Sequence, residues 1–146
     1  MDKKFMQRAI ELAKIAGGMG EVPVGAVVVK NGEIIGEGYN MRELKQNPLS
    51  HAEIEAINNA AKNLGCWRLE DCELYVTLEP CPMCTGAVIN ARIKTVIFGA
   101  YDKNAGSMDS VINLCDYPYN HKVEVYGGIC EDQCKEILQN FFQNLR

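Results

Sequence analysis

The sequence lacks the features that mark membrane and exported proteins. No apolar run approaches the roughly 20 residues that a bilayer-spanning helix needs. The first residues, Met1 to Phe5, lead into mixed polar sequence instead of the apolar core of an export signal. We therefore expect a cytoplasmic protein without a membrane partner.

The chain also lacks an excess of basic residues, internal repeats, linkers and low-complexity segments. Its net charge of −4 argues against a wholly basic nucleic-acid-binding domain. A local basic patch is still compatible with this charge, because exposed charges more than about 10 Å apart are largely screened from one another. The 146 residues and the apolar fraction of 47% fit one globular domain, which we expect to span residues 1–146.

Cysteine is plentiful, but its pattern does not indicate disulfides. The number of cysteines, seven, is odd, and no export signal is present. In a reducing cytosol, clustered cysteines more often bind metal, whereas scattered ones are usually small buried hydrophobes. We assign the second role to all cysteines outside one close pair: Cys66, Cys72, Cys115, Cys130 and Cys134.

Helical and strand patterns alternate along the chain. Helices are expected at residues 3–16, 51–64, from about 81, and at 131–145, and strands at 24–29, 33–39, 74–78, 95–98 and 123–126. Asn31 and Gly32 predict a hairpin turn, Ser50 is the expected N-cap of the second helix, and a short helical stretch is expected at 109–114. Helices that fall between strands predict an α/β protein, a three-layer α/β/α sandwich around a five-stranded mixed sheet.

Cys81 and Cys84 form the close pair. They stand three residues apart at an expected helix start, which places both sulfurs on one face, where unpaired N–H groups and the helix dipole favour thiolates. His51, at the start of another expected helix, can add a neutral imidazole. One histidine and two cysteines leave a tetrahedral zinc ion one position for water, as is typical of catalytic sites.

Glu53 follows His51 by two residues, an offset of about 200° in a regular helix. The two side chains would therefore diverge, unless His51 lies at the non-helical edge of the turn. Zinc, two thiolates and a neutral imidazole sum to zero charge, and a neutral site lowers the pKa of a bound water less than a cationic site does. We infer that Glu53 is not a ligand and that it moves protons between water and substrate.

The two motifs, His-Ala-Glu and Pro-Cys-Pro-Met-Cys, are typical of zinc deaminases of nucleobases. With other parts of the chain they resemble the bacterial tRNA-specific adenosine deaminases, a family within the cytidine and deoxycytidylate deaminase superfamily. The resembling stretches are EVPVGAV at 21–27, SHAE at 50–53, WRL at 67–69, LYVTLEPCPMC at 74–84 and VIFGA at 96–100. The resemblance implies a cytidine-deaminase-like fold, a homodimer, and hydrolytic deamination of adenosine to inosine at the wobble (first anticodon) position of tRNA.

The same resemblance implies roles for individual residues. His51, Cys81 and Cys84 would hold one zinc ion per subunit, a zinc-bound hydroxide would attack adenine C6, and Glu53 would be the proton shuttle. The expected partner is the tRNA anticodon stem-loop. Its expected contacts in or near the pocket are Asn40, Ala52, Tyr101, Asp102 and Phe142, with Lys103 and Arg146 as further candidates.

Two further surfaces are expected from the sequence. Basic residues could form a local patch that contacts phosphates, namely Arg42, Lys45, Arg92, Lys94 and Lys122. Met83 and Val88, on the helix that carries the cysteine ligands, could face the second subunit of a homodimer.

Two alternatives remain open. A free-base deaminase acting on guanine or cytosine would use the same zinc site, and the Pro-Cys-Pro-Met-Cys motif also suits guanine deaminases. The EVPVGA and WRL stretches favour the tRNA enzymes instead. A structural zinc module without catalysis would need a fourth protein ligand, which is not evident, and would give Glu53 no role.

Overall fold

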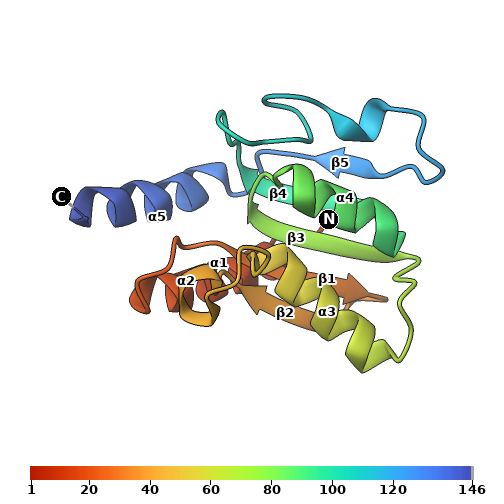
Figure 1. Cartoon of the computed structure of the whole chain (residues 1–146), viewed down its shortest axis with the longest axis horizontal. Helices are drawn as coiled ribbons and strands as arrows, with labels where there is room; N and C mark the ends of the chain where they lie inside the picture. Colours follow the sequence, from red (N-terminus) through yellow and green to blue (C-terminus); the bar gives the residue numbers. More distant parts are fainter. Residues whose placement is uncertain (146) are drawn as a thin grey trace.

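The computed structural model describes residues 1–145 and shows one five-stranded sheet with helices on both of its faces (Figure 1). The strands are β1 (Gly25–Lys30), β2 (Glu33–Tyr39), β3 (Cys72–Leu78), β4 (Thr95–Ala100) and β5 (Glu124–Tyr126). The helices are α1 (Lys3–Gly18), α2 (Arg42–Lys45), α3 (Ala52–Leu64), α4 (Pro82–Ala91) and α5 (Glu131–Asn144), with one 3-10 turn, η1 (Leu114–Asp116). Within residues 1–145, no helix is both long and apolar enough to span a membrane.

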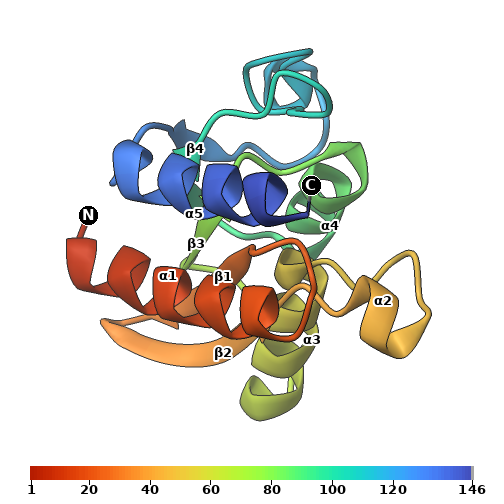
Figure 2. The same cartoon turned by 90° about the vertical axis from the view of Figure 1, so that its left-hand side faces the viewer.

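The sheet order is β2-β1-β3-β4-β5. Strand β1 runs antiparallel to both of its neighbours, whereas β3, β4 and β5 run parallel to one another. Helices α1 and α5 lie side by side on one face of the sheet, and α3 and α4 cover the other (Figure 2). The predicted three-layer sandwich with a five-stranded mixed sheet is therefore confirmed.

Strand β1 divides the apolar core into two parts, because its alternate side chains point to opposite faces. Val27 and Val29 pack with α1, and Ala26 and Val28 pack with α3. Because both faces of the strand are buried, its sequence is a continuous apolar run instead of an alternation of apolar and polar residues.

Helix α3 lies unusually close to β2. A Cβ atom at Gly36 would lie 2.5 Å from the carbonyl oxygen of Ala56, and one at Gly38 would lie 2.5 Å from that of Ala52. The helix presents alanines to these glycines, so backbone meets backbone with little side chain between them. This close approach fixes where the first turn of α3 lies over the sheet.

Three local predictions are corrected by the structure. The prediction that Ser50 is the N-cap of α3 is wrong. The carbonyl oxygen of Ser50 accepts from the Met41 amide, and the Ser50 amide donates to the carbonyl oxygen of Asn47. Ser50 therefore belongs to the preceding loop, and His51 takes the N-cap position. The helical stretch expected at 109–114 is also wrong. A 3-10 turn forms instead at Leu114–Asp116, where the Asn113 side chain accepts from the Cys115 amide.

The third correction is a short helix, α2, inside the segment 40–50 that was expected to be loop. The buried carboxylate of Glu21 accepts hydrogen bonds from the backbone amides of Glu43 and Leu44, at 3.1 and 2.6 Å. These amides belong to the first turn of α2, where helical N–H groups have no partner within the helix. A side chain distant in sequence therefore stabilises this turn.

The contact between α3 and β2 predicts a destabilising glycine substitution. Gly36→Ala would force its new methyl group against the α3 backbone, and we expect the free energy of unfolding to fall by about 1–3 kcal/mol. Urea denaturation followed by circular dichroism measures this. The control is Gly18→Ala at the end of α1, where nothing lies within 4 Å of the added atom. Equal stability of the two variants would contradict the close packing.

Candidate functional site

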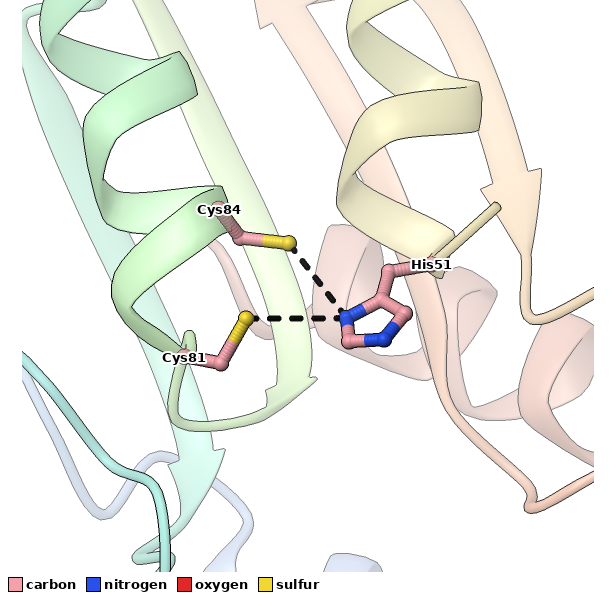
Figure 3. A group of neighbouring side chains, drawn as sticks. All are labelled: His51, Cys81 and Cys84. Atoms are coloured by element: carbon pink, nitrogen blue, oxygen red, sulfur yellow. Dashed lines mark hydrogen bonds between the residues drawn. The ribbon is translucent and has the colours of Figure 1, made fainter. Parts of the chain in front are cut away.

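Three predicted ligands, His51, Cys81 and Cys84, converge on one point (Figure 3). The Nδ1 atom of His51 lies 3.6 Å from the sulfur of Cys81 and 3.6 Å from that of Cys84. All three donor atoms lie within 4.8 Å of one another. His51 comes from the start of α3 and both cysteines from the start of α4, so two helix N-termini meet here.

The backbone at both helix starts explains this convergence. His51 and Cys81 are the N-cap residues of α3 and α4, with extended ψ angles of 157° and 177°. Pro82 occupies the first turn of α4, where a missing N–H costs no hydrogen bond. An extended N-cap residue turns its side chain toward the end of the helix rather than along its flank. His51 therefore lies at the non-helical edge of the turn, the exception that lets His51 and Glu53 face one site.

The three donors fit a zinc ion. Zinc–sulfur bonds of about 2.3 Å and a zinc–nitrogen bond of about 2.0–2.1 Å, at tetrahedral angles, place nitrogen and sulfur about 3.5–3.6 Å apart. His51 Nδ1 is 3.6 Å from each sulfur. One imidazole and two thiols are also ligands that favour zinc over magnesium or calcium. With three protein donors, a tetrahedral ion keeps one position for a small molecule.

The two thiols interact strongly with each other. The Cys84 thiol stabilises the Cys81 thiolate and lowers the pKa of Cys81 to about 4, with a further contribution from His51. The same hydrogen bond raises the pKa of Cys84. Hydrogen bonding to Cys81 raises the pKa of His51. Cys81 is thus the thiol that ionises more readily, and a bound metal would replace the remaining proton on the Cys84 thiol.

Glu53 lies beside these donors but is not one of them. Its carboxyl group is buried, with 5% of the residue exposed, and contacts the Cys84 sulfur. Burial raises the pKa of Glu53 to about 7, because a carboxylate loses hydration there. Such a group can both accept and give up a proton near neutral pH.

A cavity of about 160 Å³ opens above these residues. Its walls come from the segment before β1, the end of β3, the start of α3, and the segments that follow β2 and β4. The lining residues are Val22, Val24, Asn40, Arg42, His51, Ala52, Glu53, Leu78, Glu79, Cys81, Asp102 and Ala105.

Three of the predicted substrate contacts line this cavity: Asn40, Ala52 and Asp102. The Asn40 amide group donates to the carbonyl oxygen of Val22 at 3.2 Å and accepts from the Arg42 amide at 3.1 Å. Its orientation is therefore fixed by the backbone. The Asp102 carboxylate accepts from the amides of Asn104 and Ala105, which folds the start of its own loop.

Tyr101 and Phe142 do not line the cavity. The Tyr101 ring meets Phe98 edge-on at 5.0 Å between ring centroids, and 38% of the residue is exposed. Phe142 lies on α5 against Phe141, with 50% exposed. Lys103 is exposed on the loop after β4, and Arg146 lies outside the described residues.

Arg42 and Lys45 do not form the predicted single patch with Arg92 and Lys94. Arg42 lines the cavity, and Lys45 nearby pairs with Glu55. Arg92 follows the last residue of α4. Lys94 precedes β4, and its carbonyl oxygen accepts a hydrogen bond from the Glu124 amide. Because α4 starts at the metal ligands and its ten residues span about 15 Å, Arg92 and Lys94 lie at the far end of the sheet from the cavity.

Sequence reasoning missed Glu79 in the cavity wall. This residue is only 2% exposed, and its pKa is lowered: burial alone would raise it, but hydrogen bonds from Ser110, Asp102 and Asp109 outweigh that effect. The signal in the sequence is an acidic residue directly after a mostly apolar strand and directly before Pro80.

Comparison with known proteins shows that this chain is similar to known deaminases. The MafB19-like deaminase family matches residues 1–146. The tRNA-specific adenosine deaminase of Bacillus subtilis (strain 168) is 49% identical over 146 residues, which cover 99% of this chain and 91% of that protein.

Two solved structures are also similar. One, from a study of A-to-I editing by tRNA:A34 deaminases at the wobble position of transfer RNA, has a TM-score of 0.91 and 39% identity over 94% of this chain and 100% of that one. Guanine deaminase from Bacillus subtilis has a TM-score of 0.66 and 34% identity over 82% of this chain and 88% of that one.

The donor geometry predicts which cysteines retain metal. In purified protein, we expect about one zinc ion per chain, and we expect Cys84→Ser to lose most of it because a three-donor site becomes a two-donor site. Inductively coupled plasma mass spectrometry measures the content. Cys66→Ser is the matched control and should keep the metal, because Cys66 is exposed, contrary to the prediction that it is buried. Full zinc content in Cys84→Ser would rule out this ligand set.

Proposed function

This chain belongs to the tRNA-specific adenosine deaminases, and from that membership we propose that it hydrolyses adenosine to inosine at the wobble (first anticodon) position of tRNA. The observation that carries the proposal is the convergence of His51, Cys81 and Cys84 beside buried Glu53. Of these four residues, His51, Glu53 and Cys81 line one cavity. The reaction adds one water to adenosine and releases ammonia. It needs a nucleophile and a group that moves protons, and both can be placed in this cavity.

In this proposal His51 Nδ1 and the sulfurs of Cys81 and Cys84 hold one zinc ion per chain. When bound, zinc supplies Lewis acidity that makes water a nucleophile at neutral pH. The Glu53 carboxylate takes one proton from the attacking water and gives it to a purine ring nitrogen. It then takes the second proton from the new hydroxyl group on C6 and gives it to the amino group, which leaves as ammonia. Its burial beside Cys84 keeps it facing the site and shields it from bulk water.

The cavity also suits the shape of the proposed substrate. Its lining includes residues of the segments after β2 and β4, and in this proposal it receives an unpaired base of an anticodon loop. Asn40, Ala52 and Asp102 would contact the flipped nucleoside. Tyr101 and Phe142 are exposed aromatic residues outside the cavity, and neighbouring nucleotides of the loop could stack on them.

We extend the proposal to the domain, assembly and location of the protein. Residues 1–146 would form one deaminase domain, which works as a homodimer in the cytoplasm. Helix α4 is apolar around much of its circumference, Met83 on it is half-buried, and the segment after β4 exposes Val111 and Ile112. Such a surface fits a second copy of the chain. The expected partner contact at Val88 is wrong, because Val88 is fully buried in the core of its own chain.

One competing function has an observation in its favour. The similarity to guanine deaminase from Bacillus subtilis, with 34% identity, supports a free-base deaminase acting on guanine or cytosine. The tRNA-specific relative is more similar, with 49% identity over 99% of this chain. The tRNA reaction is therefore the better supported of the two.

A substrate comparison tests the proposed reaction. We expect adenosine-to-inosine change in an anticodon stem-loop that carries adenosine at the wobble position, detected by sequencing, and little turnover of guanine, cytosine or cytidine. The same stem-loop with guanosine at that position is the control. Turnover of a free base with none on RNA would overturn the proposal.

The role of Glu53 predicts a separation of metal binding from catalysis. We expect Glu53→Ala to keep its zinc and fold but to lose activity by at least the roughly 10²–10⁴-fold typical of lost acid–base catalysis. Metal analysis and stem-loop deamination measure the two effects. Glu70→Ala, at an exposed acidic residue, is the control. Loss of zinc in Glu53→Ala would show that Glu53 is a ligand.

A further inference from the structure

A single buried side chain, Glu79, joins the two ends of the loop that follows β4. One carboxylate oxygen, Oε1, accepts from the Asp102 amide at 3.0 Å and from the Ser110 hydroxyl. The other, Oε2, accepts from the amides of Met108, Asp109 and Ser110 at 3.2, 2.8 and 2.9 Å. Glu79 thus closes the segment 102–110 into a loop, although it lies more than 20 residues earlier in the chain.

The same loop forms a wall of the cavity. Asp102 and Ala105 line it, as do Asn40 and Arg42 of the segment after β2. The loop also rests on the turn that carries the ligands, because the Ser107 amide donates to the carbonyl oxygen of Pro80 at 2.9 Å. The position of this wall relative to Cys81 therefore depends on contacts made by Glu79 and Pro80.

Gly106 provides an independent indication that the carboxylate position is specified. A Cβ atom at residue 106 would overlap the Glu79 carboxyl group and lie 2.5 Å from the carbonyl oxygen of Asp102. The residue is buried, so the added atom could not be relieved by moving into solvent. Residue 106 must therefore lack a side chain for Glu79 to reach its five donors.

We propose that Glu79 is a positioning residue: its carboxylate holds the loop 102–110 so that Asp102 and Ala105 form the substrate-side wall of the cavity. It makes no contact with the reacting atoms in this role. Its effect is on substrate binding, not on metal binding or proton transfer. The kinetic part of this inference rests on the proposed function, whereas the structural part does not.

Glu79→Gln tests the inference because it keeps the size of the side chain and removes one acceptor. The amide oxygen can serve the three donors at 108–110, but the NH₂ group then faces the Asp102 amide, which is also a donor. In the full-length, zinc-loaded protein, we expect hydrogen exchange of the Asp102 amide to accelerate at least about tenfold, since its hydrogen bond is lost. Residue-resolved NMR exchange measures this.

The kinetic arm uses the anticodon stem-loop. We expect Glu79→Gln to raise KM about tenfold and to leave kcat within about threefold, as for the loss of an interaction that contributes equally to the ground state and the transition state. Zinc content should not change. Gly106→Ala should reproduce the rise in KM by displacing the same carboxylate, which keeps the test decisive if Glu79→Gln folds poorly.

Glu21→Gln is the matched control. Glu21 is also a buried carboxylate that accepts hydrogen bonds from backbone amides, but its donors, Glu43 and Leu44, belong to α2 and not to the segment 102–110. It should leave exchange at 102–110 unchanged.

Two outcomes would overturn the inference: unchanged exchange at Asp102 in Glu79→Gln, or a fall in kcat or zinc content without a rise in KM. If the wild-type protein deaminates a free base and not the stem-loop, the proposed function has failed. The KM comparison with that base then tests Glu79 in the same way.

Discussion

The site depends on one constraint, the meeting of two helix N-termini at the end of the sheet. His51 and Cys81 each occupy the last non-helical position before a helix, and only there can their side chains point past the helix end toward each other. Both helix starts carry unpaired N–H groups and the positive end of a dipole, which favour thiolate over thiol. The fold thus concentrates three donors and the electrostatics they need in one place.

The rest of the sandwich holds these two helix starts at a fixed separation. Helix α3 is set close to β2 by the absence of side chains at Gly36 and Gly38, and α4 follows directly from the central strand β3. A shift of either helix by one residue would move His51 or Cys81 into a helical conformation and turn its side chain away. The 3.6 Å distances from His51 to both sulfurs are therefore a property of the whole core.

Local sequence patterns predicted most of the elements and the three donors, because hydrophobic periodicity and the spacing of a motif are properties of a short stretch of chain. They failed where a distant side chain decides the local structure. The turn of α2 depends on Glu21, and the segment after β4 depends on Glu79, each more than 20 residues away. The separation of Arg92 from Arg42 was equally hidden, since it follows from the direction of α4 across the sheet.

Glu21, Glu53 and Glu79 are all buried, but their surroundings give them different roles. Glu79 accepts four hydrogen bonds from backbone amides and one from the Ser110 hydroxyl group, all within the segment 102–110. Glu21 accepts two hydrogen bonds from backbone amides of α2. Glu53 is equally buried but lies against its own backbone amide and the Cys84 sulfur, and burial raises its pKa whereas that of Glu79 is lowered. A carboxylate held by many donors loses its basicity and becomes a structural anion, while one with few donors can exchange a proton with a substrate. Burial alone therefore does not identify the proton shuttle in this cavity; the hydrogen-bond donors around the carboxylate distinguish Glu53 from Glu79.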